Sequence, residues 1–150
     1  MTIPTITPNA IAGQPSKRIH YWLWSVQILL AIVFAATGTM KTASPVTGLP
    51  ESIQGLPLPL VRLIGVCELL GAAGMILPAY LRVKPGLTAL TAAGLSTVVL
   101  LATLHHLSRA EFAEAPVTLV LGLLAAFVAW GRWKKAPIRA RGESGENRLP

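Results

Sequence analysis

Residues 63–81 read LIGVCELLGAAGMILPAYL, a run of 19 residues with one charged side chain, Glu68. A helix of about 20 residues, rising about 1.5 Å per residue, crosses a hydrocarbon core about 30 Å thick. A core helix of a soluble protein would carry a polar face at a period near 3.6 residues, whereas this run is apolar around most of its circumference. The run therefore predicts a membrane-spanning helix.

Three further runs of similar length contain no charged residue, at residues 22–40, 86–104 and 115–131. Lipid leaves unpaired backbone groups unsatisfied, so runs of this kind cross the membrane as helices. The first run exceeds the usual apolar core of a signal peptide, so we expect it to be retained. The sequence predicts an all-α fold, a bundle of four transmembrane helices.

Domain organisation follows from the same runs. We expect one membrane domain over residues 20–133, flanked by a cytoplasmic tail at residues 1–19 and a basic cytoplasmic tail at residues 134–150. Proline and polar residues dominate the two tails, which predicts that they are disordered.

The composition agrees with a membrane protein. Charged residues make up 13% of the chain, against roughly 25% in soluble domains, and mean hydropathy is +0.59. The net charge is +7. Proteins that bind nucleic acid spread Lys and Arg over a recognition face, whereas long uncharged runs separate the cations here. We therefore expect the lipid bilayer, and no nucleic acid, as a partner.

Most cations lie in the two tails and in the connection between the second and third runs. They are Lys17, Arg18, Arg82, Lys84, Arg132, Lys134, Lys135, Arg139, Arg141 and Arg148. The positive-inside rule therefore predicts that both chain ends face the cytoplasm. All Trp and Tyr residues fall at the same predicted inner side, as expected for residues that prefer the membrane interface.

The remaining ionisable residues near membrane depth collect at the predicted outer side. Glu68 follows Arg62 by six residues, roughly 9 Å along a helix. An acid in a membrane helix is costly and faces a partner or a wet cavity, and a neighbouring Lys, Arg or His would keep it ionised. We predict an outward-facing polar site. Its candidate catalytic residues are Glu68 and His106, and its candidate substrate-binding residues are Lys41, Arg62, Arg109 and Glu111.

Each candidate has a simpler alternative. Glu68 could serve only to tie two helices together by a hydrogen bond. His105 and His106 point about 100° apart on a helix, so they do not form the i, i+4 pair of a zinc helix, and we predict no metal site. We expect His105 to be hydrated at the interface. Cys67 is the only cysteine, which excludes an internal disulfide, and we expect it to be buried in packing.

Proline, glycine and alanine residues predict the structure of the connection between the first two runs and the closeness of the helices. Prolines and glycines between residues 45 and 59 predict that this connection folds back as a short irregular or helical cap over the outer polar site. Pro78 should kink or end the second helix. Many Gly and Ala residues in the runs predict close helix contacts and a tight bundle.

Several segments together resemble the DoxX-like family of small bacterial membrane proteins. The segments are GTMK at residues 38–41, GLP at 55–57, RLIGVCELLGAAGMILP at 62–78, HLSRAE at 106–111 and WGR at 130–132. The resemblance covers roughly residues 20–133. It implies a four-helix protein of the bacterial cytoplasmic (inner) membrane.

The resemblance also suggests a function. The family takes its name from a subunit associated with thiosulfate and quinone oxidation, and some members are reported in membrane redox complexes. We therefore expect a quinone-linked or redox-accessory component, with no intrinsic cofactor and a quinone as the candidate ligand. The sequence has no haem ligand pair, iron–sulfur cysteines or flavin fingerprint, so electrons would come from a membrane or redox partner protein.

Two alternative functions belong to other classes of protein. One is a cofactor-free membrane enzyme of the isomerase or cyclase type, which would use Glu68 and His106 as acid and base on a small hydrophobic substrate. The other is a non-enzymatic assembly partner or small-solute carrier, in which the polar residues hold a complex together.

Overall fold

The computed structural model describes residues 17–84 and 86–138, and its regular elements are all helical. Four helices in this part of the chain are long and apolar enough to cross a membrane, which confirms the predicted fold. They are α1 (Lys17–Ala43), α3 (Leu58–Leu81), α4 (Gly86–Ser108) and α5 (Glu114–Trp130), the last continued by the π-helical turn η3 (Gly131–Lys135).

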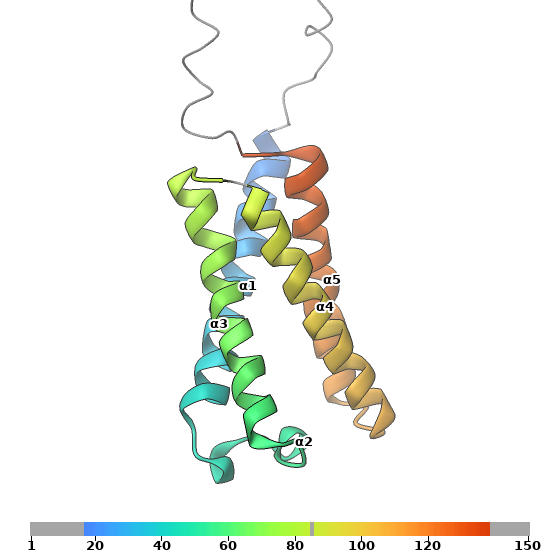
Figure 1. Cartoon of the computed structure of the whole chain (residues 1–150). Coiled ribbons are helices and arrows are strands. Elements are labelled where there is room, and N and C mark those ends of the chain that lie inside the picture. Colours follow the sequence, from blue (N-terminus) through green and yellow to red (C-terminus); the bar gives the residue numbers. More distant parts are fainter. Residues whose placement is uncertain (1–16, 85, 139–150) are drawn as a thin grey trace, which may run out of the picture.

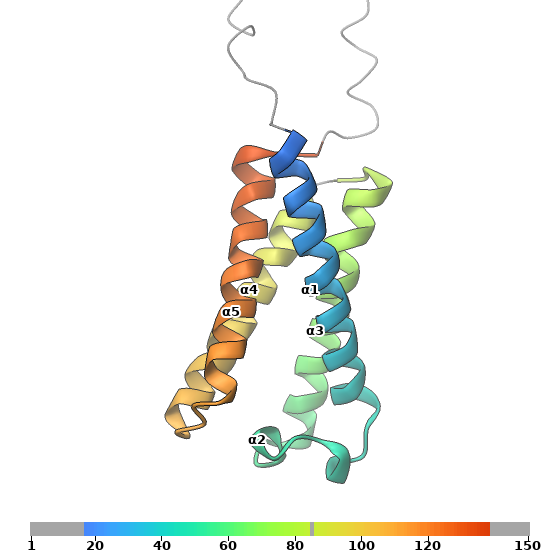
Figure 2. The same cartoon turned by 180° about the vertical axis from the view of Figure 1, so that it is seen from behind.

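The long helices form two antiparallel pairs, α1 with α3 and α4 with α5 (Figure 1). Contacts between α3 and α4 join the two pairs. The view from behind shows the pairs diverging toward one end of the bundle (Figure 2). We call this end, which carries α2 (Glu51–Gln54), the α2 end. The opposite end, where α1 and α4 begin and α3 and η3 finish, is the η3 end.

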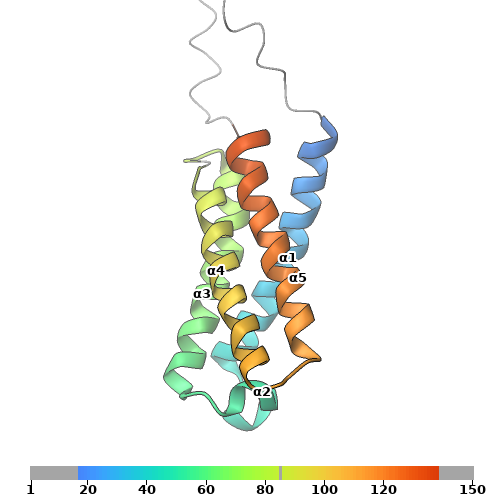
Figure 3. The ribbon, with the colours of Figure 1, turned by 90° about the vertical axis from the view of Figure 1, so that its right-hand side faces the viewer.

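Both limits of the described chain, Lys17 and Ile138, lie at the η3 end (Figure 3). This agrees with an even number of spans. The helices extend beyond the predicted domain limits of 20 and 133, because α1 already begins at Lys17 and η3 continues to Lys135. A helix satisfies its own backbone hydrogen bonds, so it can continue past the hydrocarbon core into the headgroup region. Residues 136–138 of the second predicted tail follow η3 without regular structure, and Ala136 is buried. Residues 1–16 and 139–150 of the predicted disordered tails lie outside the described residues.

The first connection contains two short helical pieces, η2 (Val46–Gly48) and α2. This confirms the expected partly helical fold of the proline-rich loop. Helix α3 continues past Pro78 and stops at Leu81, where Arg82 takes a left-handed conformation with φ 55°. Pro78 lies in the last turn and lacks the N–H that would bond the carbonyl of Gly74, but the helix continues past it until the left-handed Arg82 ends it.

Small residues bring α1 and α3 into backbone contact. A Cβ atom added at Gly38 would lie 2.8 Å from the carbonyl oxygen of Gly65. A Cβ atom added at Gly65 would lie 2.9 Å from the Cβ of Lys41. Further along α3, Gly71 faces Leu95 of α4. These contacts confirm the tight packing predicted from the small residues, which drives helix association in lipid.

Cys67 is exposed, so the prediction that it is buried was wrong. Its neighbour Glu68 is buried and bonded to side chains of α1. Successive residues on a helix point about 100° apart, so the burial of Glu68 turns Cys67 toward the outside of the bundle.

Aromatic residues surround the η3 end, as predicted for an interfacial belt. Most of them are exposed, and Trp24 is half-buried. They are Tyr21, Trp22 and Trp24 at the start of α1, Tyr80 at the end of α3, and Trp130 and Trp133 at the end of the fourth span.

Alanine substitutions test the close contact of α1 and α3. Gly38→Ala should destabilise the protein by about 1–3 kcal/mol, because the new methyl group would overlap the Gly65 backbone. Gly94→Ala is the matched control, since a Cβ there meets nothing within 4 Å. Thermal unfolding in detergent, followed by helical circular dichroism, measures both. Equal midpoints for the two variants would contradict this packing.

Candidate functional site

Glu68 is buried, with 5% of its surface exposed, and both of its carboxylate oxygens have partners on α1. Oε1 lies 2.5 Å from Nζ of Lys41, and Oε2 accepts a hydrogen bond of 3.1 Å from the hydroxyl of Thr37. The Lys41 side chain is 16% exposed. A counter-charge and a hydrogen bond from the neighbouring helix therefore offset the free-energy cost of burying the Glu68 carboxylate.

The local sequence of both helices brings these groups together. Thr37 and Lys41 are four residues apart and share a face of α1. Gly65 precedes Glu68 by three residues on α3, and it is the residue that allows α1 to approach. The close backbone contact thus places Glu68 within reach of both partners.

Arg62 binds the end of α1 and not Glu68. Its Nη1 donates to the carbonyl oxygen of Lys41 at 2.6 Å, and its Nη2 donates to that of Ser44 at 2.7 Å. The last carbonyl groups of a helix lack intrahelical partners and carry partial negative charge. Arg62 therefore caps α1, and this contact occupies both terminal nitrogens of a residue predicted to bind substrate.

A second cluster lies at the end of α4 and contains the other three site candidates. Nδ1 of His106 lies 2.7 Å from one carboxylate oxygen of Glu111, and Nε of Arg109 donates to the other oxygen at 2.7 Å. Between them, Ala110 has a positive φ of 58°, and the amide of Glu111 donates to the carbonyl of His106. This turn folds the acid back over the end of the helix.

The electrostatics of this cluster favour an ionised Glu111. Hydrogen bonds from Arg109 and then from His106 hold the pKa of the Glu111 carboxyl below its usual value. His106 itself is 7% exposed. A carboxylate at Nδ1 fixes the proton on that nitrogen, so in the neutral ring Nε2 is the proton acceptor.

The structure therefore places all six candidates at the α2 end, but in two clusters. We call the group formed by Thr37, Lys41, Arg62 and Glu68 the α1–α3 cluster. The group formed by His106, Arg109 and Glu111 is the α4 cluster. The connection between α1 and α3 approaches the α4 cluster just after α2, since a Cβ atom added at Gly55 would lie 3.7 Å from Nη1 of Arg109. His105 is half-buried, and its Nε2 has no hydrogen-bond partner among the described residues, in contrast to the hydrated position expected for it.

A third polar group, missed by the sequence reasoning, lies at the η3 end. Gln27 is fully buried, and its Nε2 donates to the carbonyl of Met75 at 2.8 Å. Arg132 is 3% exposed and donates from Nε to Oε1 of Gln27 at 2.5 Å. Its guanidinium lies 5.3 Å from the ring centre of Trp24 and 3.4 Å from Nδ1 of His20. We call these residues the Arg132 cluster.

A signal for the Arg132 cluster was present in the sequence. His20, Trp24 and Gln27 follow one another at intervals of four and three residues, which places them on one face of α1. Gln27 is also the one side-chain amide in the first span. Such a residue needs a partner from another helix.

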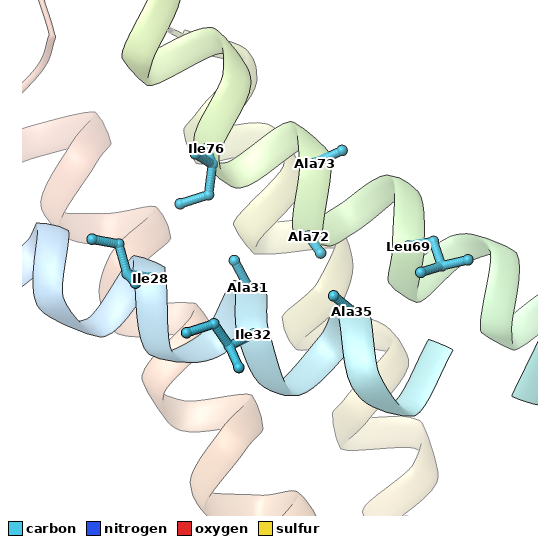
Figure 4. Close-up of a pocket in the computed structure, with 8 residues that line it drawn as sticks. All are labelled: Ile28, Ala31, Ile32, Ala35, Leu69, Ala72, Ala73 and Ile76. Atoms are coloured by element: carbon cyan, nitrogen blue, oxygen red, sulfur yellow. The ribbon is translucent and has the colours of Figure 1, made fainter. Parts of the chain in front are cut away.

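The outer surface of the α1–α3 pair carries an apolar groove of about 430 Å³ (Figure 4). Its lining residues, which are all aliphatic, are Ile28, Ala31, Ile32, Ala35, Leu69, Ala72, Ala73 and Ile76. Glu68 is adjacent to Leu69 in sequence but does not line the groove. This surface is suited to contact with lipid chains.

Four apolar spans, two of which are joined by a buried ion pair, define an integral membrane protein. A sequence profile described as the DoxX-like family matches residues 25–128, and the chain belongs to this family. No curated protein and no solved structure matched the chain. The matched range contains the α1–α3 and α4 clusters and stops before Arg132.

Acid should remove the contribution of the α4 cluster to stability. The folded-state pKa of Glu111 is depressed from 4.5, so its stabilising effect is present above pH 4.5 and is lost as the pH falls through the lower folded value. Glu111→Gln should lower the thermal midpoint at neutral pH, and the difference from the wild type should shrink below pH 4.5. Midpoints measured across acidic pH, with exposed Glu51→Gln as control, test this. A pH-independent difference would contradict it.

Proposed function

We propose that this protein is a quinone-linked or redox-accessory component of a bacterial cytoplasmic membrane, and that it exchanges protons at the α2 end. The observation that carries the proposal is the 2.7 Å contact between His106 and Glu111 at the end of a membrane span. A quinone that gains two electrons also takes up two protons, so a protein that serves it needs a proton-exchanging group at the membrane boundary. Membership of the DoxX-like family supports the same class.

His106 is suited to accept a proton from a quinol hydroxyl. Glu111 at Nδ1 orients the ring and leaves Nε2 as the acceptor. Because the pKa of Glu111 is lowered, the carboxylate stays ionised and stabilises the imidazolium that forms. Arg109 holds the second oxygen of Glu111 in place. Oxidation of the quinol releases two electrons and two protons. His106 would accept one proton, the second would pass to water at the membrane boundary, and both electrons would pass to a redox partner protein.

Glu68 has a different role in this proposal. Glu68 is the charged partner of the largely buried ammonium group of Lys41, and a buried charge without a partner is costly. Its two bonds to α1 support a structural role, the joining of α1 to α3. The alternative of an isomerase or cyclase, with Glu68 and His106 as an acid–base pair, draws no support from this arrangement, because the two residues belong to separate clusters.

The proposal includes an orientation, with the α2 end outside and the η3 end in the cytoplasm. Support comes from the distribution of charge, since ten of the 13 Lys and Arg residues of the sequence lie in the tails, in η3 or in the connection between α3 and α4. The exposed aromatic residues at that end are consistent with a membrane interface at this level.

Quinone analysis of the purified protein tests the function. We expect the full chain, purified with native lipid, to retain quinone, and membranes that contain it to show quinol-linked redox activity that depends on the chain. His106→Gln should lower this activity by roughly 100-fold or more, the usual contribution of a general base. The neighbouring His105→Gln is the matched control and should have a much smaller effect.

Two outcomes would contradict the proposal. One is the absence of bound quinone together with unchanged redox activity in His106→Gln. The other concerns the level of a second membrane protein. If that level falls when this chain is absent but stays unchanged in His106→Gln, the assembly role is favoured.

A further inference from the structure

The η3 end contains a buried cation without an acidic partner in the part of the chain that the structure describes. Arg132 is 3% exposed, and it contacts Gln27, His20 and the ring of Trp24. The ion pairs of the described residues lie at the α2 end. A buried charge that lacks a counter-charge is costly, so this end favours the binding of an anion.

The guanidinium also has a free donor. Nη2 of Arg132 is buried and has no hydrogen-bond partner among the described residues. The other nitrogens are engaged, since Nε bonds Gln27 and Nη1 makes the longer contact of 3.4 Å with His20. Gln27 in turn bonds the backbone of α3. The guanidinium is therefore held in a fixed orientation with one terminal amino group unused.

A second unpartnered polar atom lies at the same end. Thr88 is fully buried in the first turn of α4, and its hydroxyl has no partner within the described ranges. The turn η3, which carries Arg132, packs against α4. Figure 1 shows the beginnings of α1 and α4 and the end of η3 together at this end. The start of a helix also carries partial positive charge.

These features specify the chemistry of a ligand. A guanidinium amino group, a hydroxyl and a helix N-terminus together suit a negatively charged group with several acceptor oxygens, and phosphate is such a group. Exposed aromatic residues, among them Trp22 and Trp133, place this end at the level of the lipid headgroups. Lys134 and Lys135 are exposed at the same end and would attract anionic lipid.

We propose that Arg132 and Thr88 form a binding site for a phosphate group, that of an anionic phospholipid in the leaflet at the η3 end. Nη2 is covered by protein atoms, so binding requires a side chain to move. We expect half-buried His20 to move, because its contact with Arg132 is long. The site lies at the opposite end from the α4 cluster, so it is independent of the proposed quinone function.

Lipid retention and thermal stability of the full chain test this site. The protein is placed in vesicles of phosphatidylcholine, of phosphatidylcholine mixed with phosphatidylglycerol, or of phosphatidylcholine with added inorganic phosphate. Phosphatidylglycerol should raise the unfolding midpoint and remain bound when native mass spectra are recorded. Arg132→Gln should weaken its binding by about tenfold, the loss expected for one charge-assisted hydrogen bond.

Control variants separate the site from general surface charge. Arg82→Gln removes the same charge from an exposed position at the same end and should weaken phosphatidylglycerol binding much less than Arg132→Gln does. If Arg132→Gln does not fold, two milder substitutions replace it in the binding test. Arg132→Lys keeps the charge but loses the planar fork, and Thr88→Val removes the hydroxyl at similar volume, so both should weaken binding.

The three lipid conditions distinguish the source of the phosphate. Stabilisation by inorganic phosphate equal to that by phosphatidylglycerol, lost in the Arg132 variants, would support the phosphate site and assign it to a soluble ligand. No difference between the lipid mixtures for the wild type would overturn the proposal. The same holds if the Arg132 and Thr88 variants respond to phosphatidylglycerol as the wild type does.

Discussion

The ion pair between Lys41 and Glu68 joins α1 to α3 at membrane depth, and much of the α2 end depends on it. Lipid offers no solvation to a carboxylate, so Glu68 requires a partner from another helix. The partner can reach it because Gly38 and Gly65 allow the two backbones to touch. The same contact brings Arg62 to the carbonyl groups at the end of α1. The buried ion pair and the two glycines thus act together to hold α1 against α3 in one arrangement.

Buried charged side chains have different partners at the two ends of the bundle. At the α2 end, opposite charges are paired within each cluster, and His106 is left with one ring nitrogen to exchange a proton. At the η3 end, Arg132 is buried with an amide, an imidazole and an aromatic ring, and one of its amino groups has no partner among the described residues. The first arrangement suits proton exchange with a lipophilic carrier. The second suits the recognition of an anion at the headgroup level.

The spans could be predicted because length and apolarity alone decide whether a helix crosses a membrane. The gathering of polar candidates at one end followed from the alternating direction of the helices. Which residues pair could not be predicted, since spans that are apolar on most sides leave the rotation of each helix undetermined. For this reason the sequence predicts a buried Cys67 and a single polar site, whereas the structure has an exposed Cys67 and two clusters. Arg132 was treated as an orientation charge because counting cations does not reveal burial.

A double-mutant cycle on Lys41 and Glu68 tests the central claim most directly. The free energy of unfolding in detergent is measured for Lys41→Met, for Glu68→Met and for both together. The ion pair predicts a loss of about 3–5 kcal/mol for Lys41→Met, which leaves a buried carboxylate unpaired, and a recovery of most of that loss in the double variant. Strictly additive losses, or a Lys41→Met variant as stable as the wild type, would contradict a structural ion pair between α1 and α3.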